Sequence, residues 1–93
     1  MSLILKDPQA TLDYEIDWGA DYLDGDALSG SEWDVSPQHD DGPQIVSSRY
    51  TLSEAAATVS GGRPGMVYRL TNRIETMEGR SDARSIVLRV EAR

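Results

Sequence analysis

The 93-residue sequence contains no cysteine and no phenylalanine, and only one histidine and one lysine. Without cysteine, the chain can form neither disulfides nor the thiolate zinc sites that stabilise many small domains. No apolar stretch approaches the roughly 18 residues that a membrane-spanning helix needs. The formal charge of -7 disfavours nucleic acid as a partner, because phosphate binding requires a basic surface. We therefore expect neither a nucleic-acid partner nor a membrane.

The charged side chains are unevenly distributed along the chain. Residues 1–46 carry eleven acids and one base, whereas residues 47–93 carry five acids and eight arginines. Acids and arginines on neighbouring strands could pair weakly within one molecule, or the polarity could hold one subunit against the next. The predominance of arginine over lysine favours a protein partner, because arginine is enriched in interface cores.

Apolar residues recur with period two, which predicts β-strands. The clearest case is residues 12–18, where Leu, Tyr, Ile and Trp alternate with three acids. The Pro/Gly-rich residues 36–44 are expected to form a loop, because proline cannot continue a central strand. Residues 1–11 are expected to form an extended N-terminal segment. We expect the remaining strands at 31–35, 44–51, 66–76 and 84–91, an irregular or strand segment at 54–59, and turns at 60–65 and 78–81.

Six or seven short strands without a long helix predict an all-β fold. The pattern favours a small antiparallel immunoglobulin-like β-sandwich that spans residues 1–93 as one domain, with another small sandwich or barrel as the alternative. Tyr68 follows Gly65 at the start of a long strand, where a corner tyrosine can bond to upstream backbone. The inward positions predict a core of Leu12, Tyr14, Ile16, Trp18, Trp33, Tyr68, Leu70, Ile74, Ile86, Leu88 and Val90.

The sequence contains no set of residues that is typical of catalysis. His39 lies in a polar loop with no motif placing a nucleophile or a second histidine near it, which predicts an exposed, uncommitted side chain. Asp21, Asp24 and Asp26 lack the spacing of a calcium-binding loop, so a solvated acidic loop is favoured over a weak cation site. We therefore expect no enzyme activity, no cofactor and no metal.

The outward charged residues of the strands form the candidate interface. Trp18 and Trp33 offer an alternative, because exposed tryptophan rings would suit a carbohydrate-binding module. Their inward positions favour a role in the core instead. The candidate interface residues are Asp13, Glu15, Asp17, Arg69, Arg73 and Arg89.

Several motifs, taken together, resemble a known family. They are Asp7-Pro8, Leu12-Asp13-Tyr14-x-Ile16-Asp17-Trp18, Ser31-x-Trp33-x-Val35, and a long C-terminal stretch from Val59-Ser60-Gly61-Gly62 through Tyr68-x-Leu70-Thr71-Asn72-Arg73-Ile74 to Ile86-x-Leu88-x-Val90. In these motifs the chain resembles a family of small tailed-bacteriophage virion proteins, usually labelled fibre–tail adaptor or head–tail region proteins. The resemblance is strong at both ends and weaker between residues 36 and 57.

The resemblance implies a non-enzymatic structural protein of the virion. Such a protein joins or decorates virion components, as a tail or fibre adaptor or as a head or tail accessory subunit. The implied partners are tail, fibre, portal-region or capsid subunits, contacted in multiple copies in a virion that is assembled in the bacterial cytoplasm. A capsid decoration (cement) protein is the alternative within the same class.

Overall fold

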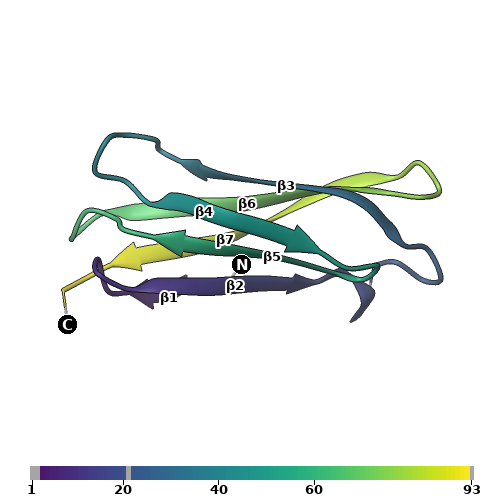
Figure 1. Cartoon of the computed structure of the whole chain (residues 1–93), viewed down its shortest axis with the longest axis horizontal. Helices are drawn as coiled ribbons and strands as arrows, with labels where there is room; N and C mark the ends of the chain where they lie inside the picture. The colour runs from purple at the N-terminus through teal and green to yellow at the C-terminus, as the bar shows by residue number, and fades with distance from the viewer. Residues whose placement is uncertain (1–2, 21, 93) are drawn as a thin grey trace.

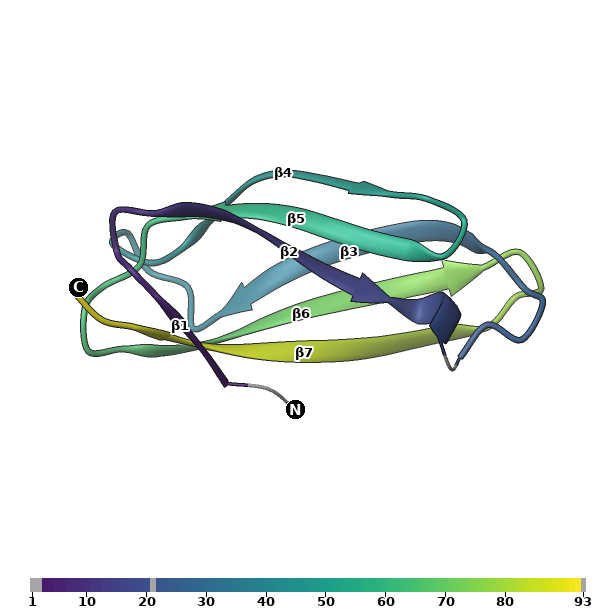
Figure 2. The ribbon, with the colours of Figure 1, turned by 90° about the horizontal axis from the view of Figure 1, so that it is seen from below.

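The computed structural model describes residues 3–20 and 22–92 and contains two β-sheets packed face to face (Figures 1 and 2). The elements are β1 (Leu3–Lys6), β2 (Thr11–Asp17), the 3₁₀ turn η1 (Trp18–Ala20), β3 (Leu28–Ser36), β4 (Gln44–Tyr50), β5 (Glu54–Ser60), β6 (Val67–Thr76) and β7 (Ser81–Val90). One sheet has the strand order β1-β7-β6-β3, and the other has the order β2-β5-β4. Figure 2 shows β2, β5 and β4 as one layer above β6 and β7. The expected all-β sandwich is confirmed.

The strand pairing is immunoglobulin-like. The β2-β5-β4 sheet matches the B, E and D strands of that fold, and β3, β6 and β7 match C, F and G. All pairs are antiparallel except β1, which runs parallel to β7. The turn after β1 carries the chain from one sheet to the other, so β1 cannot form a hairpin with β2. The extended segment expected at residues 1–11 therefore contains a strand, and the sheet that receives it is not purely antiparallel.

The alanine-rich segment expected to be irregular or extended is β5, the central strand of its sheet. Ala55, Ala57 and Val59 are fully buried there. β5 lies between β2 and β4 and faces the four-stranded sheet. Its small side chains allow the two sheets to pack closely at this position.

Two clusters of buried side chains fill the space between the sheets. Trp33 and Ile86 are half-buried and pack against both clusters, so they join the two parts of the core. The expected core residues that are buried are Tyr14, Ile16, Trp18, Tyr68, Leu70, Ile74, Leu88 and Val90.

Leu12 departs from its expected core position, because its exposed fraction is 41%. It shares the inward face of β2 with Tyr14 and Ile16, but β2 is an edge strand of its sheet. No strand covers the flank of Leu12 on the side away from β5. Tyr14 and Ile16 lie further along the same strand and are buried, whereas Leu12 lies at its beginning. Period two predicts the face of a residue but not its burial.

Trp18 lies in η1 rather than in the preceding strand, and it is fully buried. Its indole Nε1 donates a hydrogen bond to Asn72 Oδ1 at 2.9 Å. Asn72 is also fully buried and donates to Ser31 Oγ at 2.9 Å and to the carbonyl of Glu32 at 3.0 Å. This network connects η1, β6 and β3 inside the core.

Tyr68 occupies the corner between the β5–β6 turn and β6. Its hydroxyl accepts a hydrogen bond from the backbone N–H of Arg63 at 3.1 Å and lies 2.8 Å from His39 Nε2. His39 is half-buried and its ring lies against the Tyr68 ring. The expectation of an exposed, uncommitted histidine was wrong, because the loop between β3 and β4 folds back onto this corner.

Lys6, the single lysine, is fully buried. Its ammonium donates hydrogen bonds to three backbone carbonyls: Asp7 at 3.0 Å, Ala10 at 2.6 Å and Gly61 at 2.7 Å. The first two carbonyls belong to the β1–β2 turn and the third to the β5–β6 turn. Lys6 therefore ties together two turns that lie far apart in the sequence.

Candidate protein-interaction surfaces

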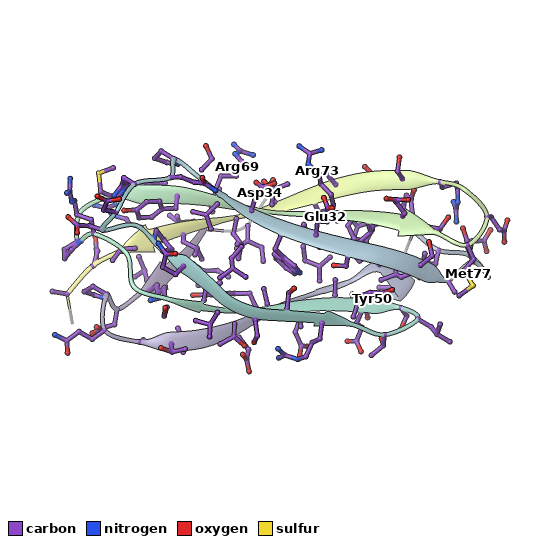
Figure 3. The ribbon with its side chains drawn as sticks, turned by 45° about the horizontal axis from the view of Figure 1, so that its top comes forward. Glu32, Asp34, Tyr50, Arg69, Arg73 and Met77 are labelled. Atoms are coloured by element: carbon purple, nitrogen blue, oxygen red, sulfur yellow. The ribbon has the colours of Figure 1, made fainter. Side chains whose placement is uncertain are left out.

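The three candidate arginines share the outer face of the four-stranded sheet. On β6, Leu70 and Ile74 point into the core, so Arg69 and Arg73 point outward and are exposed. Arg89 on β7 pairs in register with Val67 of β6 and lies on the same face. Figure 3 shows Arg69 and Arg73 rising from the same side of the sheet.

The charge on this face is balanced at one end and basic at the other. Arg73 lies opposite Glu32 of β3, and its Nε is 4.0 Å from Asp34 Oδ2 (Figure 3). Arg69 lies opposite Ser36 and makes no ion pair with a described residue. Arg89 Nε lies 2.8 Å from Glu91 Oε1, beyond the end of β7. The end of the face that carries Arg69 is therefore the one with charge available to a partner.

An exposed apolar strip lies beside these arginines. Leu3 and Leu5 of β1 pair in register with Val87 and Arg89 of β7 and therefore point outward with them. The exposed fractions are 60% for Leu3, 46% for Leu5 and 51% for Val67. We call this surface the Leu–Arg patch; it comprises Leu3, Leu5, Val67, Val87, Arg69 and Arg89.

The Leu–Arg patch includes the least protected edge of the two sheets. The edge strands β2 and β3 carry outward acids, and β4 carries Arg49 and a register shift between Ile45 and Ser47. Such charges and irregularities discourage pairing with other proteins. On β1 both outward side chains are leucines, Leu3 and Leu5. The sequence-based expectation of an extended segment at residues 1–11 does not include these leucines, although the apolar run Leu3-Ile4-Leu5 is consistent with a short strand.

The three candidate acids lie on the opposite side of the sandwich. Asp13, Glu15 and Asp17 are exposed on the outer face of β2. Asp13 accepts a hydrogen bond from Thr58 Oγ1 at 2.5 Å and lies 3.6 Å from Arg49; first the hydrogen bond and then the arginine lower its pKa. The six candidate interface residues therefore form two surfaces on opposite faces rather than one site.

A groove of about 330 Å³ opens on the acidic face. Ala56 lines it beside the acidic residues Glu15 and Glu54. Tyr50 lies at its edge, but its side chain points toward the opposite sheet, where the hydroxyl donates a hydrogen bond to the carbonyl of Ser29 at 2.9 Å. Arg49 also lines the groove, but its guanidinium lies against Asp13 and Thr58. We call this surface the acidic groove; its lining residues are Glu15, Arg49, Tyr50, Thr51, Glu54 and Ala56.

Ion pairs join the acidic first half of the chain to the arginine-rich second half. Arg63 lies 2.7 Å from Asp41, and Arg80 lies 3.1 Å from Asp26. The Asp13–Arg49 and Asp34–Arg73 pairs also connect the two halves. Each sheet contains strands from both halves, so part of the charge asymmetry is neutralised inside one molecule.

Asp26, in the acidic loop after η1, pairs with Arg80. The Asp26 side chain is only 2% exposed and accepts hydrogen bonds from the backbone N–H groups of Ala27 and Glu78 and from Arg80. Burial opposes ionisation of this carboxylate, but the hydrogen bonds that it accepts outweigh that effect and lower its pKa. Asp21 lies outside the described residues, and no group of three potential metal ligands occurs in the described part of the chain.

We expect Asp26→Asn to lower stability and to flatten its dependence on pH in acid. The pKa of Asp26 is lower in the folded than in the unfolded chain, so the unfolded chain binds more protons as the pH falls. The stabilisation by Asp26 is full above the unfolded pKa of about 3.9 and is lost as the pH falls through the folded pKa. Urea unfolding between pH 3 and pH 7 measures this difference.

Asp24→Asn is the matched control in the same loop. Asp24 is exposed and has a φ of 46°, a conformation that asparagine tolerates. The control should keep the wild-type pH profile. If Asp26→Asn and Asp24→Asn gave the same profile, Asp26 would have no special role in the stability of the loop.

The two tryptophans differ in their access to solvent. Trp18 is fully buried and cannot offer a ring to a carbohydrate. Trp33 is half-buried and lines a groove of about 550 Å³ together with His39 and Ile45. The buried Trp33 Nε1 and His39 Nδ1 atoms have no hydrogen-bond partner in the described residues. The rings of Trp18 and Trp33 therefore do not form a shared flat surface that could bind a carbohydrate.

The chain matches a known protein family. A family model described as podophage GP4 fiber-tail adaptor protein gp77 matches residues 6–89. No curated protein matches the chain at a significant level. Among the described residues, no helix is long and apolar enough to cross a membrane.

Proposed function

The chain belongs to the podophage GP4 fibre-tail adaptor family, and on that premise we propose that it uses the Leu–Arg patch to join virion components. The family is one of structural phage proteins, so the chain is a virion component whose partners are other virion proteins. In this proposal the protein is not an enzyme and works through protein–protein contacts.

The single observation that carries the proposal is the composition of the Leu–Arg patch. Leu3, Leu5 and Val67 expose apolar surface on the flat face of a sheet. Contiguous exposed apolar surface beside polar residues marks interaction sites, and arginine is among the residues enriched in interfaces. A rigid sheet also loses little conformational freedom on binding, which suits a structural joint.

The proposal also specifies the neighbours and the place of assembly. The neighbours that the Leu–Arg patch would contact are tail, fibre, portal-region or capsid subunits, and several copies would assemble in the particle. Assembly would take place in the bacterial cytoplasm. The acidic groove on the opposite face gives the same molecule a second contact surface, as a protein that links two components requires.

We expect the double variant Arg69→Glu, Arg73→Glu to fold normally and to be incorporated into particles at least about tenfold less efficiently. A tenfold loss corresponds to about 1.4 kcal/mol of binding free energy, which is modest for two reversed charges in an interface. Phage carrying the variant gene would be purified, and the amount of this protein per particle measured by quantitative mass spectrometry.

The two single variants locate the effect on the face. Arg73 already lies near Asp34 outside the Leu–Arg patch, so Arg73→Glu is a charge-matched control for Arg69→Glu. Arg69→Glu should account for most of the loss. Normal incorporation of the double variant would contradict the proposal that this face contacts a neighbour.

A further inference from the structure

We infer that one partner of the Leu–Arg patch is a second copy of this chain, which receives the patch in its acidic groove. This inference rests on the proposed function and specifies a partner for the same surface. It follows from three properties of the two surfaces: their chemistry, their charge and their positions on opposite sides of the sandwich.

The two surfaces are chemically complementary. The Leu–Arg patch presents Leu3, Leu5 and Val67 beside arginines. The acidic groove presents the carboxylates of Glu15 and Glu54 beside the short side chains of Thr51 and Ala56. Docking would bring arginines against these carboxylates while leucine and valine cover the short side chains between them, so that an apolar centre lies within a charged rim.

Charge favours this pairing over the two symmetric ones. A patch docked on a second patch would bring Arg69 and Arg89 of both copies together. A groove docked on a second groove would oppose two sets of carboxylates. Like charges placed together across an interface cost several kcal/mol, whereas opposite charges steer the encounter and fix its register. The net charge of -7 on each copy causes a longer-range repulsion between copies. This repulsion is largely screened at physiological salt, where the Debye length is about 8 Å.

The positions of the surfaces determine the kind of assembly. The Leu–Arg patch lies on the outer face of the four-stranded sheet, and the acidic groove lies on the outer face of the three-stranded sheet. A contact between two such surfaces leaves one patch and one groove unoccupied at the ends of every pair. Head-to-tail contacts of this kind extend until they close into a ring or continue as a filament.

Mixing two variants tests this geometry. The patch variant is Val67→Thr with Arg69→Glu, which keeps a β-branched residue in the strand and reverses the charge. The groove variant is Glu15→Lys with Glu54→Lys, both exposed positions. Sedimentation velocity and light scattering would follow the mass of each protein at 0.15 M salt up to about 1 mM, and circular dichroism would verify folding.

A head-to-tail contact predicts a different mass for the wild type, for each variant alone and for their mixture. The wild-type mass should rise with concentration beyond a dimer, and each variant alone should remain a monomer. An equimolar mixture should form a 1:1 dimer and no larger species, because only one intact patch and one intact groove are present in each pair.

Two outcomes would overturn the inference. If the groove variant associates alone, the patch pairs with itself. If the wild type stays monomeric throughout, a second copy is not the partner. The second result would leave the proposed function standing, because reduced incorporation of Arg69→Glu into particles would then report a contact with a different virion protein.

Discussion

Replacing Trp18 with alanine is expected to lower the free energy of unfolding by about 3–5 kcal/mol. A chain of 93 residues has a total stability of about 5–14 kcal/mol, so the variant would be close to unfolding at room temperature. Trp18 is the largest fully buried side chain, and its removal leaves a cavity between the two sheets that the surrounding strands can only partly fill. Urea unfolding followed by far-UV circular dichroism measures the loss.

Part of the expected loss comes from the hydrogen-bond network rather than from packing. Asn72 Oδ1 accepts its bond from Trp18 Nε1, and no other donor to that oxygen is found among the described residues. A buried amide oxygen without a donor costs about 1–3 kcal/mol. The guanidinium of Arg84, which lies 4.5 Å from the Trp18 ring centre, also loses its aromatic contact.

Two phenylalanine variants separate these contributions. Trp18→Phe keeps an aromatic ring but leaves Asn72 Oδ1 unpaired, and we expect it to cost about 1–3 kcal/mol. Trp33→Phe makes the same chemical change at a half-buried ring whose Nε1 has no partner in the described chain. It removes an unsatisfied donor and should change stability by less than about 1 kcal/mol. Equal losses in the two variants would show that the Trp18–Asn72 bond contributes little.

The sequence predicts most of the strands because burial on one face leaves a period-two pattern. The alternation in residues 12–18 and in the last two strands is sufficient to orient Tyr68, Leu70 and Leu88 toward the core. The corner position of Tyr68 could also be recognised, because a glycine-rich turn precedes it. These features depend on residues close together in the chain.

The remaining features depend on contacts between distant segments. Leu12 is exposed at the beginning of the edge strand β2, and β5 is central because two other strands pair with it. His39 is half-buried because it packs against Tyr68 and lies within hydrogen-bond distance of its hydroxyl, although the two residues are 29 positions apart in the sequence. None of these contacts leaves a local pattern in the sequence.

The candidate interface shows the same limit. Period two indicates that Asp13 and Arg69 both point outward, but it does not indicate that they belong to opposite faces of the sandwich. Strand order provides that information. It also explains how Asp13 and Asp34, from the acidic half of the chain, lie near arginines from the other half.

Replacing Lys6 with methionine is expected to lower the free energy of unfolding by about 2–4 kcal/mol. Methionine nearly matches the length and apolar stem of lysine but donates no hydrogen bond. The carbonyls of Asp7, Ala10 and Gly61 would lose the ammonium that they share, although the Asp7 carbonyl would keep the hydrogen bond that it accepts from Ala10 N–H. Each carbonyl left without a donor costs about 1–3 kcal/mol where water cannot replace the bond, and removing a buried charge recovers part of that cost.

The loss should be local before it is global. The backbone carbonyl of Lys6 accepts a hydrogen bond from Glu91 N–H, so loosening of β1 should accelerate amide exchange at Glu91 more than at Leu70 in the core. Arg69→Met is the matched control, because it removes one positive charge at an exposed position and should change stability by less than about 0.5 kcal/mol. Wild-type unfolding and exchange in Lys6→Met would mean that the carbonyls of Ala10 and Gly61 find other donors. In that case the β5–β6 turn would be held by its packing against β7, where an added Cβ at Gly62 would lie 2.7 Å from Val90 Cγ2, rather than by the lysine.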